Sequence, residues 1–112
     1  YNKSRTYMAF VIGDGDNVGY LKGQHFDWMN ERLQKCLEKP SPRGCFPLVW
    51  TQSPQGLHLA PDLMRWYYNQ ALKTKNDYFV LPPSGDLYSY PAMMNEADLK
   101  RFVEDTERDC LL

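Results

Sequence analysis

The sequence predicts an α/β domain with the order β-α-β-α-β-α and parallel strands, as a fragment of a (β/α) barrel-like domain. Two observations carry this prediction: the sequence contains three short apolar runs, and stretches with helical periodicity separate them. Apolar runs at residues 7–12, 46–51 and 78–81 alternate with stretches of helical periodicity. Strands that alternate with helices of this length pair in parallel through right-handed crossovers. Three such units cannot close a barrel, which needs about 250 residues. We therefore expect residues 1–112 to form a single partial domain that the remainder of the same chain completes.

The first strand is expected at residues 7–12, where an unbroken apolar run predicts burial on both faces. Polar residues follow it directly, and ligands of parallel α/β folds bind at the carboxyl ends of strands. Asp14, Asp16 and Asn17 are therefore candidate site residues. We expect one of these side chains to cap the next helix and at least one carboxylate to face the site.

The first helix is predicted at residues 24–38 and is ended by the Pro- and Gly-containing segment 40–44. A second strand follows and ends at Trp50 and Thr51, with Gln52 directly after it. The inward face of this helix is predicted to consist of Phe26, Met29, Leu33 and Leu37.

The second helix is predicted to begin near Pro61, because proline suits the first turn of a helix. After the third strand, residues 82–94 form a long loop. Asn95 and Asp98 then resemble a capping box that opens the third helix. The inward residues are predicted to be Leu63, Met64, Tyr67, Tyr68, Ala71 and Leu72 on the second helix, and Leu99, Phe102, Val103 and Thr106 on the third.

The glycine- and aspartate-rich turn after the first strand has two alternative interpretations, and the sequence disfavours both. A dinucleotide-binding turn would place Asp14 and Asp16 against a pyrophosphate, and the second strand ends without an acid to hold a ribose. A calcium loop would need oxygen ligands where Val18 and His25 stand. Carboxylates at a strand end instead suit general acid, base or nucleophile chemistry.

The loop after the third strand carries a further set of candidate residues. Two prolines stiffen its start, and Tyr88 and Tyr90 stand two residues apart. Tyrosines in a cleft offer a flat apolar face and a hydroxyl group, which suits a sugar ring. The same loop contains Asp86. Because all three loops follow parallel strands, we expect Asp14, Gln52 and Asp86 at one end of the sheet.

The remaining composition excludes several partner classes. A net charge of −1 without a basic run argues against nucleic acid, and no apolar stretch is long enough to predict a membrane span. His25 is expected to be solvated on its helix, whereas His58 lies in the loop after the second strand and could approach a ligand. These two histidines do not form a metal-binding pair, so no metal and no cofactor are predicted for this stretch.

The three cysteines show no metal-ligand spacing. Cys36 and Cys45 flank one helix–loop–strand connection and would be able to pair in an extracellular protein. The alternative is that these residues and Cys110 are separate thiols that pack as small hydrophobic side chains. The sequence leaves both states open.

Gly85-Asp86-Leu87-Tyr88-Ser89-Tyr90-Pro91 resembles the Gly-x-Gly-Tyr-x-Tyr-Pro signature of the GxGYxYP putative glycoside hydrolases. The segment 14–17 after an apolar strand is similar to that family as well, as is Trp50-Thr51-Gln52-Ser53-Pro54 with Ala60-Pro61. Leu87 stands in place of the second glycine of the signature, and it would be strained there if that position needs a positive φ. The resemblance implies the C-terminal, barrel-like domain of a larger carbohydrate-processing protein.

The sequence is thus interpreted as part of a glycoside hydrolase that acts on a carbohydrate substrate. The candidate catalytic residues are Asp14, Asp16 and Asp86, and the candidate substrate-binding residues are Asn17, Trp50, Gln52, Tyr88 and Tyr90. Two alternatives remain open. A metal-dependent carbohydrate deacetylase would need histidine ligands from elsewhere in the full chain, and a non-catalytic glycan-binding module would keep the tyrosines without the acid geometry.

Overall fold

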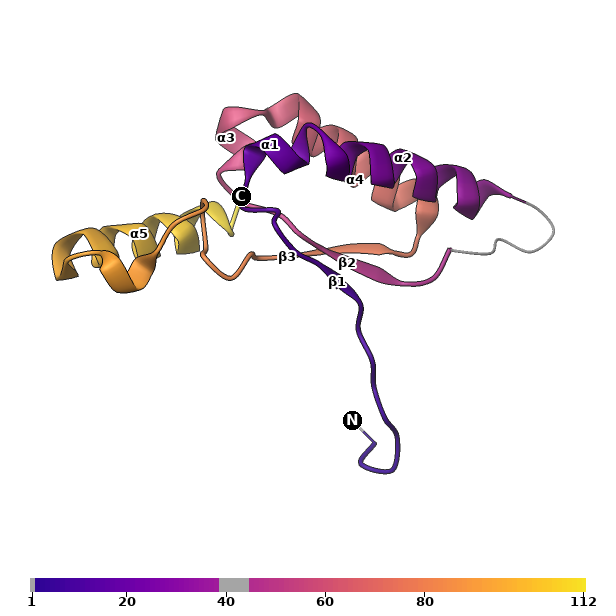
Figure 1. The fold of residues 1–112 in the computed structure, drawn as a ribbon, viewed down its shortest axis with the longest axis horizontal. Helices are drawn as coiled ribbons and strands as arrows, with labels where there is room; N and C mark the ends of the chain where they lie inside the picture. Colours follow the sequence, from indigo (N-terminus) through magenta and orange to yellow (C-terminus); the bar gives the residue numbers. More distant parts are fainter. Residues whose placement is uncertain (1, 39–44) are drawn as a thin grey trace.

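The computed structural model describes residues 2–38 and 45–112, and it contains one three-stranded parallel sheet. Strands β1 (Val11–Ile12), β2 (Leu48–Thr51) and β3 (Asp77–Val80) lie in sequential order. Ile12 is paired with Trp50, which is paired in turn with Phe79. The predicted α/β architecture with parallel strands is therefore confirmed (Figure 1).

Two long helices cover one face of this sheet. Helices α2 and α4 pack against each other, and Figure 1 shows both on the same side of the strands. The last helix, α5, lies beyond the carboxyl ends of the strands instead (Figure 1). The helices are α1 (Val18–Leu21), α2 (Gln24–Leu37), α3 (Gly56–Leu59), α4 (Pro61–Thr74) and α5 (Glu96–Asp109), with a 3₁₀ turn at Pro91–Met93.

The core lies between the sheet and these two helices. Met29 is fully buried, and Trp50 and Tyr67 are almost so. The Tyr67 hydroxyl donates a hydrogen bond to the backbone carbonyl of Leu21, at 2.5 Å, which ties α4 to α1. Burial raises the pKa of Tyr67, because the phenolate would be poorly solvated there. Leu21 and Leu48 belong to the same cluster of buried residues.

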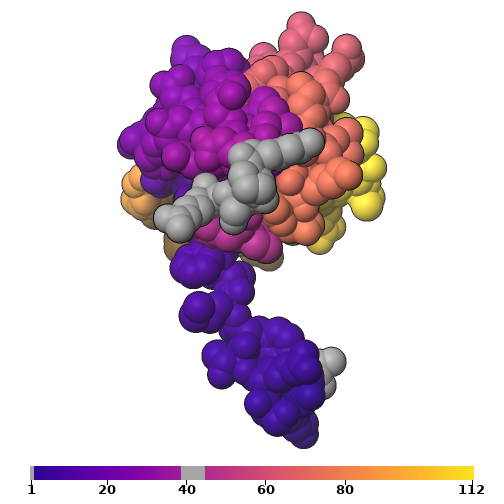
Figure 2. Space-filling model, turned by 90° about the vertical axis from the view of Figure 1, so that its right-hand side faces the viewer, coloured from indigo at the N-terminus to yellow at the C-terminus, as the bar shows by residue number. Residues whose placement is uncertain are grey.

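The first predicted strand is much shorter in the structure. Only Val11 and Ile12 pair with β2, and the indigo N-terminal segment projects away from the body (Figures 1 and 2). Tyr7, Met8 and Phe10 are exposed, so the prediction that residues 7–12 are buried on both faces is wrong. The physical reason is that β1 is an edge strand here and has a partner on one side alone.

The predicted inward faces of the helices are confirmed in part. Met29, Met64 and Tyr67 are buried, but Leu37, Leu72 and Val103 are exposed. On α4 the buried positions are 64, 67, 70 and 74, so the stripe that faces the sheet is rotated away from residue 72. Leu37 is the last residue of α2, where the helix extends past the core.

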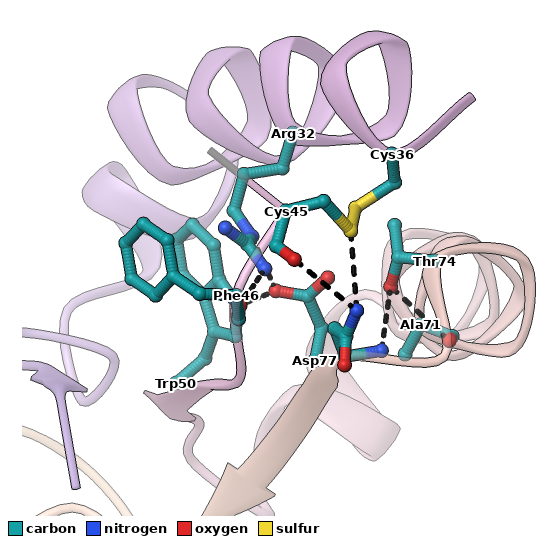
Figure 3. The surroundings of a disulfide bond; sticks show 9 residues. Arg32, Cys36, Cys45, Phe46, Trp50, Ala71, Thr74 and Asp77 are labelled. Atoms are coloured by element: carbon teal, nitrogen blue, oxygen red, sulfur yellow. Dashed lines mark hydrogen bonds and ion pairs between the residues drawn. A yellow bond between two sulfur atoms is a disulfide. The ribbon is translucent and has the colours of Figure 1, made fainter. Parts of the chain in front are cut away.

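Buried polar bonds hold the amino-terminal ends of β2 and β3 beneath α2 (Figure 3). Arg32 Nε donates to Asp77 Oδ1 at 2.6 Å, and Trp50 Nε1 donates to the same oxygen at 2.8 Å. Cys36 and Cys45 form a disulfide nearby, which selects the paired state from the two that the sequence left open. The predicted helix-ending segment 40–44 lies outside the described residues.

None of the helices in residues 2–38 and 45–112 has the length and apolar character that spanning a bilayer requires. The longest of them contain 14 residues. A helix needs about 20 apolar residues to cross a membrane.

Candidate functional site

The turn after β1 is built by close backbone contact with the end of β2. The Gly15 N–H donates to Thr51 Oγ1 at 2.9 Å, and the Gly15 carbonyl accepts from the Ser53 N–H at 2.9 Å. A Cβ atom on Gly15 would lie 1.6 Å from the Thr51 carbonyl oxygen, so this position admits only glycine. The preceding residue, Asp14, has a left-handed backbone with φ of 63°.

The three polar residues of this turn have different roles. Asn17 caps α1, since its side-chain oxygen accepts from the Gly19 N–H at 2.9 Å. Asp16 is buried, whereas Asp14 is exposed. The expectation that one side chain would cap the helix is therefore confirmed for Asn17. Of the two carboxylates, Asp14 is the one that reaches solvent.

Asp16 attaches the tyrosine-containing loop to the turn. Ser84 Oγ donates to Asp16 Oδ2 at 2.5 Å, and the Tyr88 N–H donates to the Asp16 carbonyl at 3.1 Å. The side chain and the main chain of Asp16 thus bind two points of the loop that follows β3, the strand at the opposite edge of the sheet. Because the acceptor is a carboxylate, the bond from Ser84 is of the stronger, charge-assisted type.

Tyr88 and Tyr90 form an exposed pair on this loop. Their hydroxyl oxygens are 2.8 Å apart, and their rings meet edge to face with centroids separated by 5.6 Å. The pKa of Tyr88 is raised first by its hydrogen bond with Tyr90, and the negative charges of Asp16 and Asp14 add to the effect. The turn carboxylates and the tyrosine pair therefore belong to one electrostatic environment.

Asp86 belongs to a second cluster, with residues of α3 and α5. With its amide oriented to donate, Gln55 Nε2 lies 3.1 Å from Asp86 Oδ2 and 3.1 Å from Asp109 Oδ2. His58 Nε2 lies 3.2 Å from Asp109 Oδ1. Burial and then the charge of Asp109 raise the pKa of Asp86, whose Oδ1 has no hydrogen-bond partner among the described residues.

Trp50 lies in β2 and Gln52 directly follows this strand, but the two side chains have different surroundings. Trp50 is 2% exposed and donates to Asp77, so its ring lies in the core and not at the surface of the site. Gln52 lines a cavity of about 220 Å³ next to Ser53. In the described part of the chain, neither Gln52 Oε1 nor Ser53 Oγ has a hydrogen-bond partner.

The family of this chain follows from its sequence. A model of the GxGYxYP putative glycoside hydrolase C-terminal domain matches residues 4–110. The chain belongs to this family. No match was found among curated proteins.

A solved structure agrees with this GxGYxYP assignment. The chain resembles the crystal structure of a putative hydrolase from Bacteroides thetaiotaomicron VPI-5482, with 33% sequence identity and a TM-score of 0.69. The match covers 90% of this chain and 18% of that protein. The chain therefore spans less than a fifth of the length of the hydrolase that it resembles.

The structure accounts for the departure of this GxGYxYP chain from the family signature. Within the described residues, positive φ angles occur at Gly85 in the signature loop, and otherwise at Asp14 and Lys75. Leu87, which replaces the second glycine, does not adopt the left-handed conformation. The strain considered for leucine at this position therefore does not arise in this loop.

His25 is not solvated, contrary to the sequence-based expectation. It is 2% exposed and packs against Trp50, with ring centroids 5.7 Å apart. Burial lowers the pKa of His25, while the charge of Asp14 acts in the opposite direction. The predicted stripe began at Phe26, but the buried residues of α2 are His25, Met29 and Arg32. The buried face is therefore rotated from the predicted one and includes His25.

Sequence reasoning also missed Ser84 and Asp109. Ser84 lies in a loop and Asp109 at the end of α5, where polar residues are usually solvated. Asp16, which bonds to Ser84, and His58, which pairs with Asp109, are far away in the sequence, so no local pattern predicts these contacts. In residues 2–38 and 45–112, no group of three or more His, Cys, Asp or Glu is arranged to hold a metal ion.

Proposed function

We propose that this chain supplies part of the carbohydrate-binding and catalytic site of a glycoside hydrolase. One observation carries the proposal. The bonds that Asp16 makes to Ser84 and Tyr88 dock an exposed tyrosine pair beside the turn that exposes Asp14. A flat aromatic surface with hydroxyl groups next to a carboxylate suits a sugar and the chemistry of its glycosidic bond.

The structural surroundings suggest a division of roles among the three candidate acids. Asp14 is the exposed carboxylate and acts on the substrate directly. Asp16 is the positioning residue of the tyrosine loop. Asp86 is a candidate proton donor, because a buried carboxylic acid with a raised pKa retains its proton at higher pH. A glycosidase uses two carboxyl groups, about 5–5.5 Å apart for retention or roughly 6.5–9.5 Å for inversion.

Tyr88 and Tyr90 are the proposed sugar contacts, through ring faces and hydroxyl groups. Asn17 retains its amide N–H groups for a substrate hydroxyl while its oxygen caps α1. Gln52 is a further candidate, because its amide oxygen has no hydrogen-bond partner among the described residues. We assign no sugar contact to Trp50, because its ring is buried.

A non-catalytic glycan-binding module is the second candidate function, and one observation favours it. Asp16 and Asp86 both face partners within the protein, so Asp14 is the exposed member of the three candidate acids. A binding module needs the tyrosine pair but not a second reactive carboxyl group. The deacetylase alternative gains no such support, because His25 is buried against Trp50 and His58 pairs with Asp109.

The remainder of the protein is part of the proposal. Sequential parallel strands with α2 and α4 on one face are the arrangement from which a (β/α) barrel is extended. We propose that further strands complete a barrel-like domain and that one of them supplies a partner carboxylate if Asp86 does not.

The decisive experiment screens the full-length protein against a glycan panel with analysis of the products. Asp14→Asn should reduce turnover by roughly 10²–10⁴-fold, the usual contribution of an acid–base group. Sugar binding should persist in this variant, whereas Tyr88→Ala should weaken binding. Turnover that survives in a correctly folded Asp14→Asn protein would rule out the catalytic role. Binding without turnover in the wild-type protein would instead support the binding module.

A further inference from the structure

A second hollow lies beside Asp14. It has a volume of about 260 Å³, and its walls include Tyr20 from α1, Trp28 and Gln24 from α2, and Asp14 itself. This is below the roughly 300–1,000 Å³ of pockets that hold drug-sized ligands, so it suits a single ring. None of these residues takes part in the site described above except Asp14.

The aromatic wall of this hollow is exposed but firmly supported. Trp28 is 40% exposed and Tyr20 is 41% exposed. The imidazole of buried His25 stacks on Trp28, with ring centroids 5.8 Å apart and planes inclined by 25°. The same imidazole packs against Tyr20, with ring centroids 5.9 Å apart. His25 in turn packs against Trp50 in the core. An aromatic ring held in this way loses little conformational entropy when a ligand covers it.

The polar groups of the hollow complement the aromatic wall. Asp14 contributes a carboxylate and Gln24 an amide, which together both accept and donate hydrogen bonds. The charge of Asp14 acts on His25 at the back of the hollow and also on Tyr88 of the tyrosine pair. Asp14 therefore lines the hollow and is also close enough to the tyrosine pair for its charge to act there.

We propose that this hollow, formed by Tyr20, Gln24 and Trp28 beside Asp14, is a second sugar subsite. The inference rests on the proposed function and extends it: the substrate is an oligosaccharide whose sugar units occupy both the hollow and the tyrosine pair. One unit stacks on Trp28 while another lies against Tyr88 and Tyr90. Such a ligand uses both apolar ring faces and hydroxyl groups, which is the chemistry that the two surfaces offer.

The test measures binding by the full-length protein to cellohexaose, xylohexaose, mannohexaose and chitohexaose, and to the corresponding methyl glycosides. Trp28→Ala should weaken binding of the hexasaccharide by roughly 2- to 10-fold, the usual effect of losing one aromatic contact. The methyl glycoside, held at the tyrosine pair, should bind as before. Trp28→Phe should bind the hexasaccharide with an affinity between those of the wild type and Trp28→Ala. This variant keeps the test valid if the alanine variant does not fold.

The matched control is Trp66→Phe, because Trp66 stacks on Phe26 elsewhere on the molecule. This variant should leave both affinities unchanged. Equal hexasaccharide affinity in Trp28→Ala and wild-type protein would overturn the subsite, even if Asp14→Asn abolishes turnover. The subsite would also be overturned if the fluorescence of Trp28 in the ligand-free, full-length protein were protected from quenching by acrylamide. The remainder of the protein would then cover this side chain. A failure of the proposed function differs from both, because it appears as unchanged turnover in Asp14→Asn.

Discussion

Ser84 donates its hydroxyl to the Asp16 carboxylate at 2.5 Å, across 68 residues of sequence. This bond joins the loop that follows β3 to the turn that follows β1, although β2 lies between these strands. It explains why Asp16 is buried while Asp14, two residues earlier, is exposed. One carboxylate organises the loop, and the other reaches solvent.

Replacing Ser84 by alanine should loosen the tyrosine loop. The change leaves a buried carboxylate without its hydroxyl donor, which costs about 1.5–3 kcal/mol for a charge-assisted bond. Chemical denaturation should show this loss of stability, and glycan binding should weaken with it. Ser89→Ala is the control, because Ser89 makes only a 3.3 Å bond to the Ser84 carbonyl. Equal stability of the two variants would contradict the anchoring role of Asp16.

Two glycines of the first turn should respond very differently to alanine. At Gly15 the added Cβ would lie 1.6 Å from a backbone oxygen of Thr51, so the strand ends must separate. We expect Gly15→Ala to cost about 3 kcal/mol or more, the upper range for overpacking. At Gly13 no atom lies within 4 Å of the added Cβ, and the change should be nearly neutral. Thermal unfolding of both variants tests this, and a mild effect of Gly15→Ala would contradict the close approach of Gly15 to Thr51.

Asp86 should make stability depend on pH. Because its pKa is raised in the folded protein, the folded state binds more protons than the unfolded state above the ordinary carboxyl pKa. Its contribution to stability is therefore full at acid pH and is lost as the pH rises through the raised value. Asp86→Asn should gain stability over the wild type near neutral pH and little at acid pH. Melting curves across this range test the sign, and a constant difference would refute the assignment.

The disulfide predicts a specific thiol count. In the denatured, unreduced protein, an alkylating reagent should label Cys110 and leave Cys36 and Cys45 unmodified. The Cys36→Ser, Cys45→Ser double variant should lose about 2–3 kcal/mol of stability, because the bond closes a short loop in the unfolded chain. Mass spectrometry after alkylation measures the first effect and denaturant titration the second. Labelling at all three cysteines would exclude the bond in the isolated protein.

Local patterns in the sequence were sufficient to predict the order of the strands and the long helices and several of their boundaries, but not the short helices α1 and α3. Pro61 begins α4 as expected, and Asn95 caps α5 by accepting from the Asp98 N–H at 3.0 Å. These features depend on residues within one helical turn of one another. The parallel pairing followed from the same alternation of strands and helices, because connections of that length constrain how neighbouring strands can lie.

The tertiary structure decided which polar side chains meet. Asp14 and Asp16 have the same local setting, yet Ser84 selects Asp16 as the buried one. Asp86 stands in the signature loop, but its carboxyl faces Asp109 at the end of α5. Such contacts depend on how the loops and α5 settle against one another, and no periodicity in the sequence encodes that placement. Burial also depends on tertiary packing: His25 is covered because α2 packs on the sheet and brings it against Trp50 of β2.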